Sequence, residues 1–309
     1  MESYYLIKQR INNPFVLWPG YTNERYFKFI VSQLEDQNNN FKTFIDKTND
    51  SINCYIQIEK LSWDTNFFKF NCAKIRHIFI NEELSFEKIT LIASRVGKLL
   101  HDYFKSHNYK FIFADIDAHS SKLNYFIQKI GFLFVINWLD GYVRSDKNRR
   151  VGLPNDNLIK QGEVERVAHI AKQYYYKGGR FYSDPNFQFD QIDQMYYQTI
   201  INSYNNKDII IVERHNKIPI GAFISKEIKV YKEFDNLRVA HLRFLVIDPA
   251  YRGLNIGYKL FTQIIDIMTL KSDIIVTGLE SNNIVSLNLH NKFYFKYNYS
   301  HNAYHLWLR

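Results

Sequence analysis

The sequence predicts an α/β (α+β) protein built from two mixed-sheet domains, of which the first is degenerate and the second complete. Short apolar runs typical of strands alternate with segments whose apolar residues recur at helical spacing. The order strand, helix, strand, helix, strand occurs once in each half of the chain. A polar segment with Gly and Pro, residues 145–156, separates the halves as inter-domain linkers do. We therefore expect domains at residues 1–150 and 151–309.

The first half is expected to carry the incomplete repeat. Its strands and helices are predicted in alternation at residues 74–80, 86–104, 110–115, 120–130 and 133–143. The connection between its first strand and first helix contains Glu82 and Glu83, and carboxylates at that place would repel a phosphate. The first half therefore has the repeat without a ligand loop.

The second half begins with two amphipathic helices, followed by a hairpin and alternating strands and helices. Gly178-Gly179 ends the first helix, and residues 215–217 form the hairpin turn. The predicted elements, in order, cover residues 164–176, 189–204, 208–214, 218–225, 239–247, 256–270, 274–277, 284–292 and 304–308.

The segment from Leu242 to Leu260 is the most informative part of the chain. It contains a buried strand, an exit at Asp248-Pro249, a short loop with glycines and the start of a helix. Such a loop presents unpaired main-chain N–H groups and the positive end of the helix dipole to an anion. These features predict a pyrophosphate site, in which an arginine adds positive charge and a glycine allows close approach. Its residues are Arg252, Gly253, Leu254, Asn255, Ile256, Gly257 and Tyr258.

The composition of the chain limits the kinds of partner that it is expected to bind. The chain has 309 residues, of which 46% are hydrophobic, enough for one large core or two ordinary ones. Lys and Arg number 40 against 31 Asp and Glu, which gives a net charge of +9. The basic residues are spread rather than clustered, so we expect no nucleic-acid partner. A solubilising surface and attraction of phosphorylated small molecules are both consistent with this charge.

Cysteine usage and hydropathy indicate a cytoplasmic protein. Cys54 and Cys72 lack metal-ligand spacing, and no His/Cys/Asp cluster has it either, so we expect no metal site. The N-terminus lacks the basic and apolar segments of a secretory signal, and no apolar run approaches the length of a membrane span. We expect no membrane partner.

The stretch Val246–Gly257 resembles the pyrophosphate loop of the GCN5-related N-acetyltransferase (GNAT) superfamily, and Asn283–Phe295 looks like that family's closing helix. The resemblance covers roughly residues 158–309. Asn255 stands where the common loop pattern has Gly, but Asn tolerates left-handed backbone. His290 stands at the usual Tyr position and Tyr294 at the usual Gly. The resemblance implies two GNAT-like domains, the second being a complete catalytic domain that binds acyl-CoA.

A narrower resemblance spans most of the chain. Residues 61–70, Arg180 to Pro185 and the end Trp307-Leu308-Arg309 look like the bacterial dTDP-fucosamine N-acetyltransferase group. The chain is also similar to a variant that transfers 3-hydroxybutyrate to dTDP-3-amino-3,6-dideoxygalactose. These resemblances imply an N-acyltransferase that moves a short acyl group from acyl-CoA to the amine of a dTDP-linked amino sugar, for surface polysaccharide (lipopolysaccharide) biosynthesis. They imply no metal and leave a homodimer open.

An acyl-CoA transferase must align the pantetheine arm and polarise the thioester carbonyl. The main chain of Phe244, Leu245 and Val246 is expected to pair with the pantetheine amides. If this strand splays after a bulge, its N–H groups would stabilise the charge on the thioester oxygen. Asn283 is expected to cap the closing helix or to bind CoA.

Proton transfer is less well defined. His290, in place of the family's Tyr, is a candidate general acid for a thiolate whose thiol pKa is about 8.5, and local packing is its alternative role. For the base there is no firm candidate. His241 and Glu280 lie near the site in sequence, and for each a structural role is the alternative. Relay of the proton to solvent through water is a further alternative.

The acceptor is expected over the first helices of the second half. Arg180 would pair with the diphosphate, and Phe181 and Tyr182 would stack on thymine or cover the sugar. The first-half signature residues have core packing as their favoured role; these are Trp63, Asp64, Phe67 and Phe68. A protein, peptide or antibiotic amine is an alternative acceptor, and a non-catalytic CoA-binding module is an alternative class.

Overall fold

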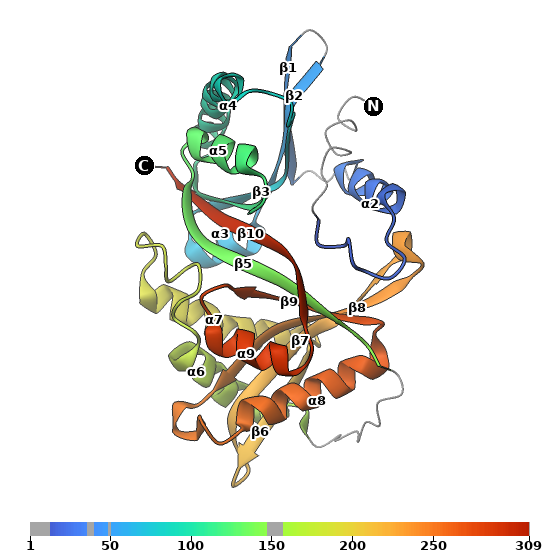
Figure 1. Cartoon of the computed structure of the whole chain (residues 1–309). Coiled ribbons are helices and arrows are strands. Elements are labelled where there is room, and N and C mark those ends of the chain that lie inside the picture. The colour runs from blue at the N-terminus through green and yellow to red at the C-terminus, as the bar shows by residue number, and fades with distance from the viewer. Residues whose placement is uncertain (1–12, 36–39, 49–50, 147–156, 309) are drawn as a thin grey trace. The chain divides into compact units, whose positions relative to one another are not determined.

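A computed structural model of the chain describes residues 13–35, 40–48, 51–146 and 157–308 (Figure 1). The chain forms two compact units. The first comprises the residues up to Leu17, Tyr21–Trp138 and the residues from Tyr299 onward, and the second comprises Trp18–Gly20 and Leu139–Asn298. The strand β5 (Leu133–Arg144) begins in the first unit and ends in the second, whereas β10 (Lys296–Trp307) begins in the second and ends in the first.

The two units differ from the two sequence halves in the placement of these strands. Residues 139–146 belong to the second unit, and the C-terminal residues from Tyr299 belong to the first. The expected linker lies outside the described residues beyond residue 146. The predicted boundary at residue 150 falls in that undescribed part and stays a prediction.

The first unit contains a sheet in the order β1-β2-β3-β4-β10. The neighbouring strands are antiparallel except β3 and β4, which are parallel. Its other elements are α2 (Asn23–Glu35), β1 (Phe41–Thr48), β2 (Ser51–Lys60), α3 (Ser62–Phe68), β3 (Asn71–Ile80), α4 (Phe86–Ser106), β4 (Tyr109–Asp117) and α5 (Ser121–Ile130).

The helices α4 and α5 form because their apolar residues repeat at helical spacing and their ends are capped. The hydroxyl of Ser85 accepts from the amide of Lys88, and that of Ser120 accepts from the amide of Leu123. Gly131, with a φ of 110°, ends α5 in a left-handed conformation that suits glycine. Both helices bury their apolar stripes in one core with strands β2, β3, β4 and β10.

The second unit contains a sheet in the order β9-β8-β7-β6. The strands β6, β7 and β8 are antiparallel, whereas β8 and β9 are parallel. Its elements are α6 (Val164–Tyr174), α7 (Phe189–Asn205), β6 (Ile209–His215), β7 (Ile218–Tyr231), β8 (Leu237–Ile247), α8 (Ile256–Lys271), β9 (Ile274–Glu280) and α9 (Ile284–Lys292).

Two cores lie on opposite faces of this second sheet, because successive side chains of a strand point to opposite faces. On β6, Ile210 and Val212 pack with α6 and α7, whereas Ile211 packs with α8. On β7, Ala222 contributes to the first of these cores and Phe223 to the second. The sheet is therefore covered by α6 and α7 on one face and by α8 on the other.

The fold class predicted from the sequence is confirmed, and the predicted helices and strands are all present. Several strands are longer than predicted: β7 continues to Tyr231, β9 to Glu280, and β10 begins at Lys296. The elements α2, β1, β2 and α3 were not predicted. On β1 no side chain is buried, so its sequence carries no apolar run.

Candidate functional site

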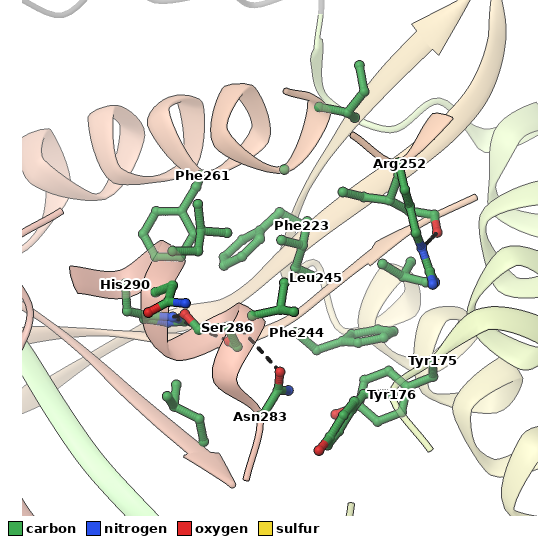
Figure 2. Close-up of a pocket in the computed structure, with 18 of the residues that line it drawn as sticks. Tyr175, Tyr176, Phe223, Phe244, Leu245, Arg252, Phe261, Asn283, Ser286 and His290 are labelled. Atoms are coloured by element: carbon green, nitrogen blue, oxygen red, sulfur yellow. Dashed lines mark hydrogen bonds between the residues drawn. The ribbon is translucent and has the colours of Figure 1, made fainter. Parts of the chain in front are cut away.

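The site lies where two parallel strands of the second unit part. The β8–β9 ladder consists of the pairs Val239–Ile274, Ala240–Ile275 and His241–Val276. Beyond this point β8 continues to Ile247 and β9 continues to Glu280. A cleft of about 1050 Å³ occupies the fork (Figure 2). Its walls are β8 from Leu242, the loop and start of α8, the end of β9, α9 and the C-terminal end of α6.

A bulge at Arg243 turns the side chains of β8 as it enters the cleft. Ser225 of β7 pairs with Leu242 and Ile224 with Phe244, so Arg243 is the extra residue. Before the bulge, Leu242 packs in the core with α8; after it, Phe244 packs with α6 and α7. A one-residue shift inverts the alternation of a strand. The bulge that the sequence analysis invoked for the splay is therefore present.

The loop that follows β8 has the conformation of an anion site. Asn255 has a φ of 62° and precedes α8 in a left-handed conformation, as expected for Asn in place of Gly. Gly253 has a φ of 79°, and a Cβ there would meet nothing within 4 Å, so the loop is open. The first amide to close a helical bond to the loop is that of Lys259, which donates to Asn255.

The amides from Gly253 to Tyr258 donate to no other group in the part of the chain that the structure describes. The first turn of α8 contains no acidic residue. Unpaired amides at the positive end of a helix dipole attract anions. The loop therefore offers an anion a set of free main-chain donors at the mouth of the cleft.

Arg252 ties this loop to the end of α6. Its guanidinium donates to the main-chain oxygens of Ile247 and Tyr174, at 3.2 Å and 3.0 Å (Figure 2). Before it, the Asp248 carboxylate accepts from the amide of Ala250 and from Arg166. The Arg252 side chain is exposed and lines the cleft, so its charge stands beside the open amides.

The opposite wall of the cleft carries a carboxylate among tyrosines. Glu280 ends β9 and is 5% exposed. Burial raises its pKa, while Arg180 and a hydrogen bond from Asn283 oppose that shift. Tyr175 and Tyr176 line the cleft, and the ring of Tyr175 stacks on that of Tyr196 with centroids 3.7 Å apart.

Residues 166–295 match the family model described as the acetyltransferase (GNAT) family. The matched segment lies within the second unit, and this part of the unit is called the GNAT domain below. Acetyl-CoA is the cosubstrate of that family, and the matched segment contains the loop, the fork and the whole closing helix.

Solved structures match over most of the chain at low identity, which shows the fold. A GCN5-related N-acetyltransferase from Sphaerobacter thermophilus matches with a TM-score of 0.56 and 10% identity, over 92% of this chain and 86% of its own. A tandem GNAT protein from the clavulanic acid biosynthesis pathway matches with a TM-score of 0.52 and 8% identity, over 99% and 93%. No curated protein sequence matches the chain.

A third structure is a fungal GCN5-related glucosamine N-acetyltransferase region within a multi-domain β-N-acetylglucosaminidase. It matches with a TM-score of 0.56 and 12% identity, over 99% of this chain and 37% of its own.

His290 lines the cleft of the GNAT domain but is buried and locally bonded. Its Nδ1 lies 2.8 Å from the main-chain oxygen of Ser286 and its Nε2 3.1 Å from the hydroxyl of Thr277. Because a carbonyl only accepts, Nδ1 carries the proton and Nε2 accepts from Thr277. Burial lowers the pKa of His290 to about 4. The imidazole is therefore neutral near pH 7, which fits the packing alternative better than a general acid.

His241 is not among the residues that line the cleft of the GNAT domain. It sits at the last rung of the β8–β9 ladder, where burial, followed by the charges of Lys226 and Lys229, lowers its pKa to about 4. Of the two residues named as candidates for the base, the cleft is therefore lined by Glu280 and not by His241. Asn283 does line the cleft, and its side-chain oxygen caps α9 by accepting from the amide of Ser286.

The residues expected to hold the sugar nucleotide are placed differently. Phe181 and Tyr182 are buried, and the Tyr182 hydroxyl donates to Asp193. Neither ring is open to stack on a base, because both pack inside the GNAT domain. Arg180 is half-buried, with its guanidinium 4.7 Å from the Phe181 ring centre, and it is close enough to Glu280 to lower the pKa of that carboxyl.

Sequence reasoning missed Tyr175 and Tyr176 as wall residues of the cleft. The run Tyr174-Tyr175-Tyr176 directly before Gly178-Gly179 is the signal that could have found them. In the first unit, Trp63 and Phe67 stack on one face of α3 with centroids 5.2 Å apart, and Phe68 is buried. Core packing, the role favoured for that signature, is thus seen for Phe68, whereas Trp63 is 42% exposed.

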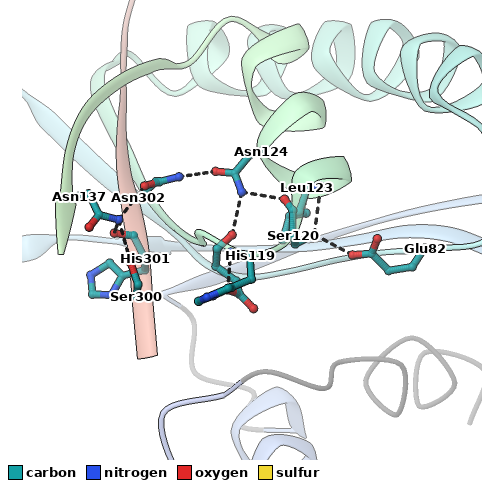
Figure 3. Close-up of polar contacts among 10 residues, drawn as sticks. Glu82, His119, Ser120, Leu123, Asn124, Asn137, Ser300, His301 and Asn302 are labelled. Atoms are coloured by element: carbon teal, nitrogen blue, oxygen red, sulfur yellow. Dashed lines mark hydrogen bonds and ion pairs between the residues drawn. The ribbon is translucent and has the colours of Figure 1, made fainter. Parts of the chain in front are cut away.

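The first unit repeats the fork but closes it. The parallel β3–β4 ladder ends at Ile75–Ala114, yet β3 continues to Ile80. The Ser120 hydroxyl donates to the Glu82 carboxylate at 2.7 Å (Figure 3). The Lys122 ammonium donates to the main-chain oxygen of Glu82. The loop after β3 is therefore bonded to the start of α5.

The amides of the first unit's loop are also occupied. The amide of Asn81 donates to the main-chain oxygen of Asn53. The amide of Glu83 donates to the Asn81 side chain, and that of Leu84 donates to the Asn81 main-chain oxygen. At the start of α5, Asn124 donates to the main-chain oxygens of Asp117 and Ser120 (Figure 3). An anion would meet a carboxylate and bonded amides there, in contrast to the open loop of the GNAT domain.

The described residues contain no group of three His, Cys, Asp or Glu side chains that could hold a metal ion. Among the helices in the same residues, none combines the length and apolar character of a membrane span.

Proposed function

We propose that the protein is an acyl-CoA-dependent N-acyltransferase whose acceptor is the amine of a dTDP-linked amino-dideoxy sugar. The observation that carries the transferase is the set of open amides from Gly253 to Tyr258 at the mouth of a fork between β8 and β9. It supplies an anion site and an adjoining open strand edge, which are the two things that an acyl-CoA requires.

The CoA pyrophosphate is assigned to the loop. The amides of residues 253–258 donate to its oxygens, and Arg252 and the α8 dipole neutralise part of its charge. Leu254 and Tyr258 are exposed beside these amides and flank the nucleotide end. Gly257 leaves room for the turn, because a Cβ there would lie 3.2 Å from the Ile247 side chain.

The pantetheine arm is assigned to the free edge of β8. Beyond His241 this strand pairs with β7 on one side, while its β9 ladder has ended. The main-chain groups of Phe244, Leu245 and Val246 can therefore pair with the amides of the arm, as an added strand would. Their side chains serve the two cores. This places the thioester near the bulge, where main-chain N–H groups can stabilise its oxygen.

The reaction forms one bond and breaks one. The acceptor ammonium loses a proton, the neutral nitrogen attacks the thioester carbonyl, the C–N bond forms and the C–S bond breaks. The nitrogen then loses its second proton, which leaves a neutral amide, and the CoA thiolate takes up a proton through water. The thiol pKa is about 8.5, so water suffices as the donor at neutral pH. His290 is not required as an acid, in keeping with its neutral state.

Three observations support the sugar-nucleotide acceptor. The signatures at residues 61–70, 180–185 and 307–309 resemble the dTDP-amino-sugar group. A structure of the same fold is described as a glucosamine N-acetyltransferase region. The cleft wall carries Tyr175 and Tyr176, and tyrosine rings with hydroxyls suit a sugar face. Acetyl and 3-hydroxybutyryl are the acyl groups proposed, and surface polysaccharide synthesis is the proposed setting.

The test is release of free thiol from acetyl-CoA or 3-hydroxybutyryl-CoA in the presence of a panel of amines. The panel contains dTDP-3-amino and dTDP-4-amino sugars, a lysine peptide and an aminoglycoside. We expect release with a dTDP-amino sugar and little with the others. Turnover of only the peptide or the aminoglycoside would show that this amine, and not a dTDP-amino sugar, is the acceptor. CoA binding without turnover of any amine would indicate a non-catalytic module.

A further inference from the structure

We infer that Glu280 is the catalytic base that takes the proton from the acceptor ammonium, in a seat formed with Tyr175, Tyr176 and Tyr196. This inference rests on the proposed function and names the amine's position within the same cleft. Glu280 is the last residue of β9, directly across the fork from the β8 edge that is proposed to hold the thioester.

The seat is built closely around the carboxylate. A Cβ placed on Gly179 would lie 3.0 Å from Oε1 of Glu280 and 3.8 Å from the Tyr196 hydroxyl. A glycine at residue 179 is therefore what lets the loop after α6 approach the carboxylate without displacing it. Tyr176 is held in place because its hydroxyl donates to the main-chain oxygen of Asn282. The tyrosines that follow α6 and Tyr196 of α7 thus lie near the end of β9.

Asn283 lies beside the carboxylate. Its side-chain oxygen accepts from the amide of Ser286, which leaves its NH₂ group to face Glu280, and this contact lowers the pKa of that carboxyl. Figure 2 shows Asn283 on the cleft side of α9, facing the tyrosines. One side chain thereby caps the first turn of α9 and favours the ionised form of the base.

The charges that face Glu280 favour its ionised form. Arg180, in the loop after α6, lowers the pKa of this carboxyl, against the larger effect of burial, which raises it. The tyrosines that face it stay neutral, because burial together with the Glu280 charge raises the pKa of Tyr175 and of Tyr176. Arg243, on β8, faces Tyr175.

A buried carboxylate between aromatic rings is the chemistry that recognises an ammonium group. The rings of Tyr175 and Tyr196 stack on each other, and the Phe244 ring lies 5.0 Å from that of Tyr175. Aromatic faces attract a cation, and the carboxylate supplies the opposite charge in a poorly hydrated place. Because burial also raises the pKa of Glu280, the carboxylate is a stronger base than an exposed one.

The step balances. One N–H bond of the ammonium breaks and its proton passes to the Glu280 carboxylate. The freed lone pair forms the C–N bond as the C–S bond breaks. As the C–S bond breaks, the nitrogen gives up its second proton, which passes through water to the thiolate and leaves a neutral amide and the CoA thiol. The protonated Glu280 returns the first proton to solvent when the amide product leaves.

The experiment compares Glu280→Gln and Glu280→Asp with wild type, and uses Glu165→Gln as the matched control. Glu165 carries an exposed carboxylate on α6 and does not line the cleft. Turnover of the dTDP-amino sugar is measured from pH 5 to 9, and the Kd for CoA is measured by calorimetry. We expect Glu280→Gln to lower kcat about 10²- to 10⁴-fold, the usual effect of losing a general base, with an unchanged Kd for CoA.

The pH profile separates a base from a structural residue. Wild-type kcat should rise with pH through the raised pKa of Glu280. Glu280→Gln should lose this rise. Glu280→Asp should keep the rise but reach a lower kcat at high pH. If wild type is active and Glu280→Gln retains its kcat and its acidic limb, Glu280 is not the base. If wild type binds CoA but acylates no amine, the proposed function fails and the base with it. A variant whose Kd for CoA is unchanged is correctly folded, so its loss of turnover is not due to misfolding.

Discussion

Reversal of the charge at Arg252 is the sharpest test of the loop. The side chain is exposed and stands beside the free amides, so its interaction with a pyrophosphate is partly screened. Two unit charges 4 Å apart interact by about 1 kcal/mol in water and about 4 kcal/mol near a protein surface. Taking the lower value, we expect Arg252→Ala to cost about 1 kcal/mol of CoA binding, or about fivefold in Kd.

Arg252→Glu should cost about twice as much, or roughly 30-fold in Kd, because a repulsion replaces the attraction. Calorimetry at about 0.05 M and 1 M salt is the assay. The difference between variant and wild type should shrink at high salt, where the Debye length falls to about 3 Å. Lys105→Glu in the first unit makes the same change of charge away from the cleft and should leave Kd unchanged.

A control for folding is needed because Arg252 also bonds the main chain of Ile247 and Tyr174. Thermal melting of each variant shows whether these two hydrogen bonds contribute to the stability of the fold. The reasoning would be refuted if Arg252→Glu bound CoA as tightly as wild type at low salt, since the pyrophosphate could not then lie beside residues 252–258.

Asn255→Gly should retain CoA binding, whereas Asn255→Val should weaken it, because a β-branched residue in the left-handed region costs about 1–2 kcal/mol; equal Kd values for both variants would show that the conformation at φ 62° is not needed. Because the pKa of His290 is lowered from 6.5 to about 4, the unfolded chain binds the proton more readily, and about 3 kcal/mol of folding stability should be lost as pH falls from about 6.5 to 4. Denaturant titrations at pH 7 and pH 4.5 measure this loss, and His290→Gln should remove it. An unchanged pH dependence in that variant would count against the prediction. Titration calorimetry should give one CoA per chain, because the loop of the first unit is bonded to α5 through Glu82, and a stoichiometry of two would contradict that closure.

Most of the fold could be predicted from the sequence, because the helices and inner strands have strong periodicities. The helices at residues 86–106 and 256–271 were expected within two residues of their observed ends. The edge strand Phe41–Thr48 was not, since its exposed positions mix Lys, Asp and Thr with isolated aromatics. The exchange of β5 and β10 between units is a tertiary feature that local patterns do not encode.

The loop could be predicted for a local reason. Its conformation depends on a few neighbouring residues, and Asn255 takes the left-handed conformation expected of it. The acceptor side depends on long-range packing. Phe181 and Tyr182 are aromatic residues after a Gly-Gly stop, which fits a ligand loop equally well, but the structure buries both. Their partners, Phe187 and Asp193, are too far along the chain for a local pattern to reveal.

The central claim is that main-chain amides between Gly253 and Tyr258 grip the pyrophosphate of CoA. Amide hydrogen exchange of the peptide spanning these residues, with and without CoA, tests it most directly. These amides have no partner in the described part of the free chain, so they should exchange fast without the ligand and become protected on its addition. Tight CoA binding with unchanged exchange at residues 253–258 would contradict the claim.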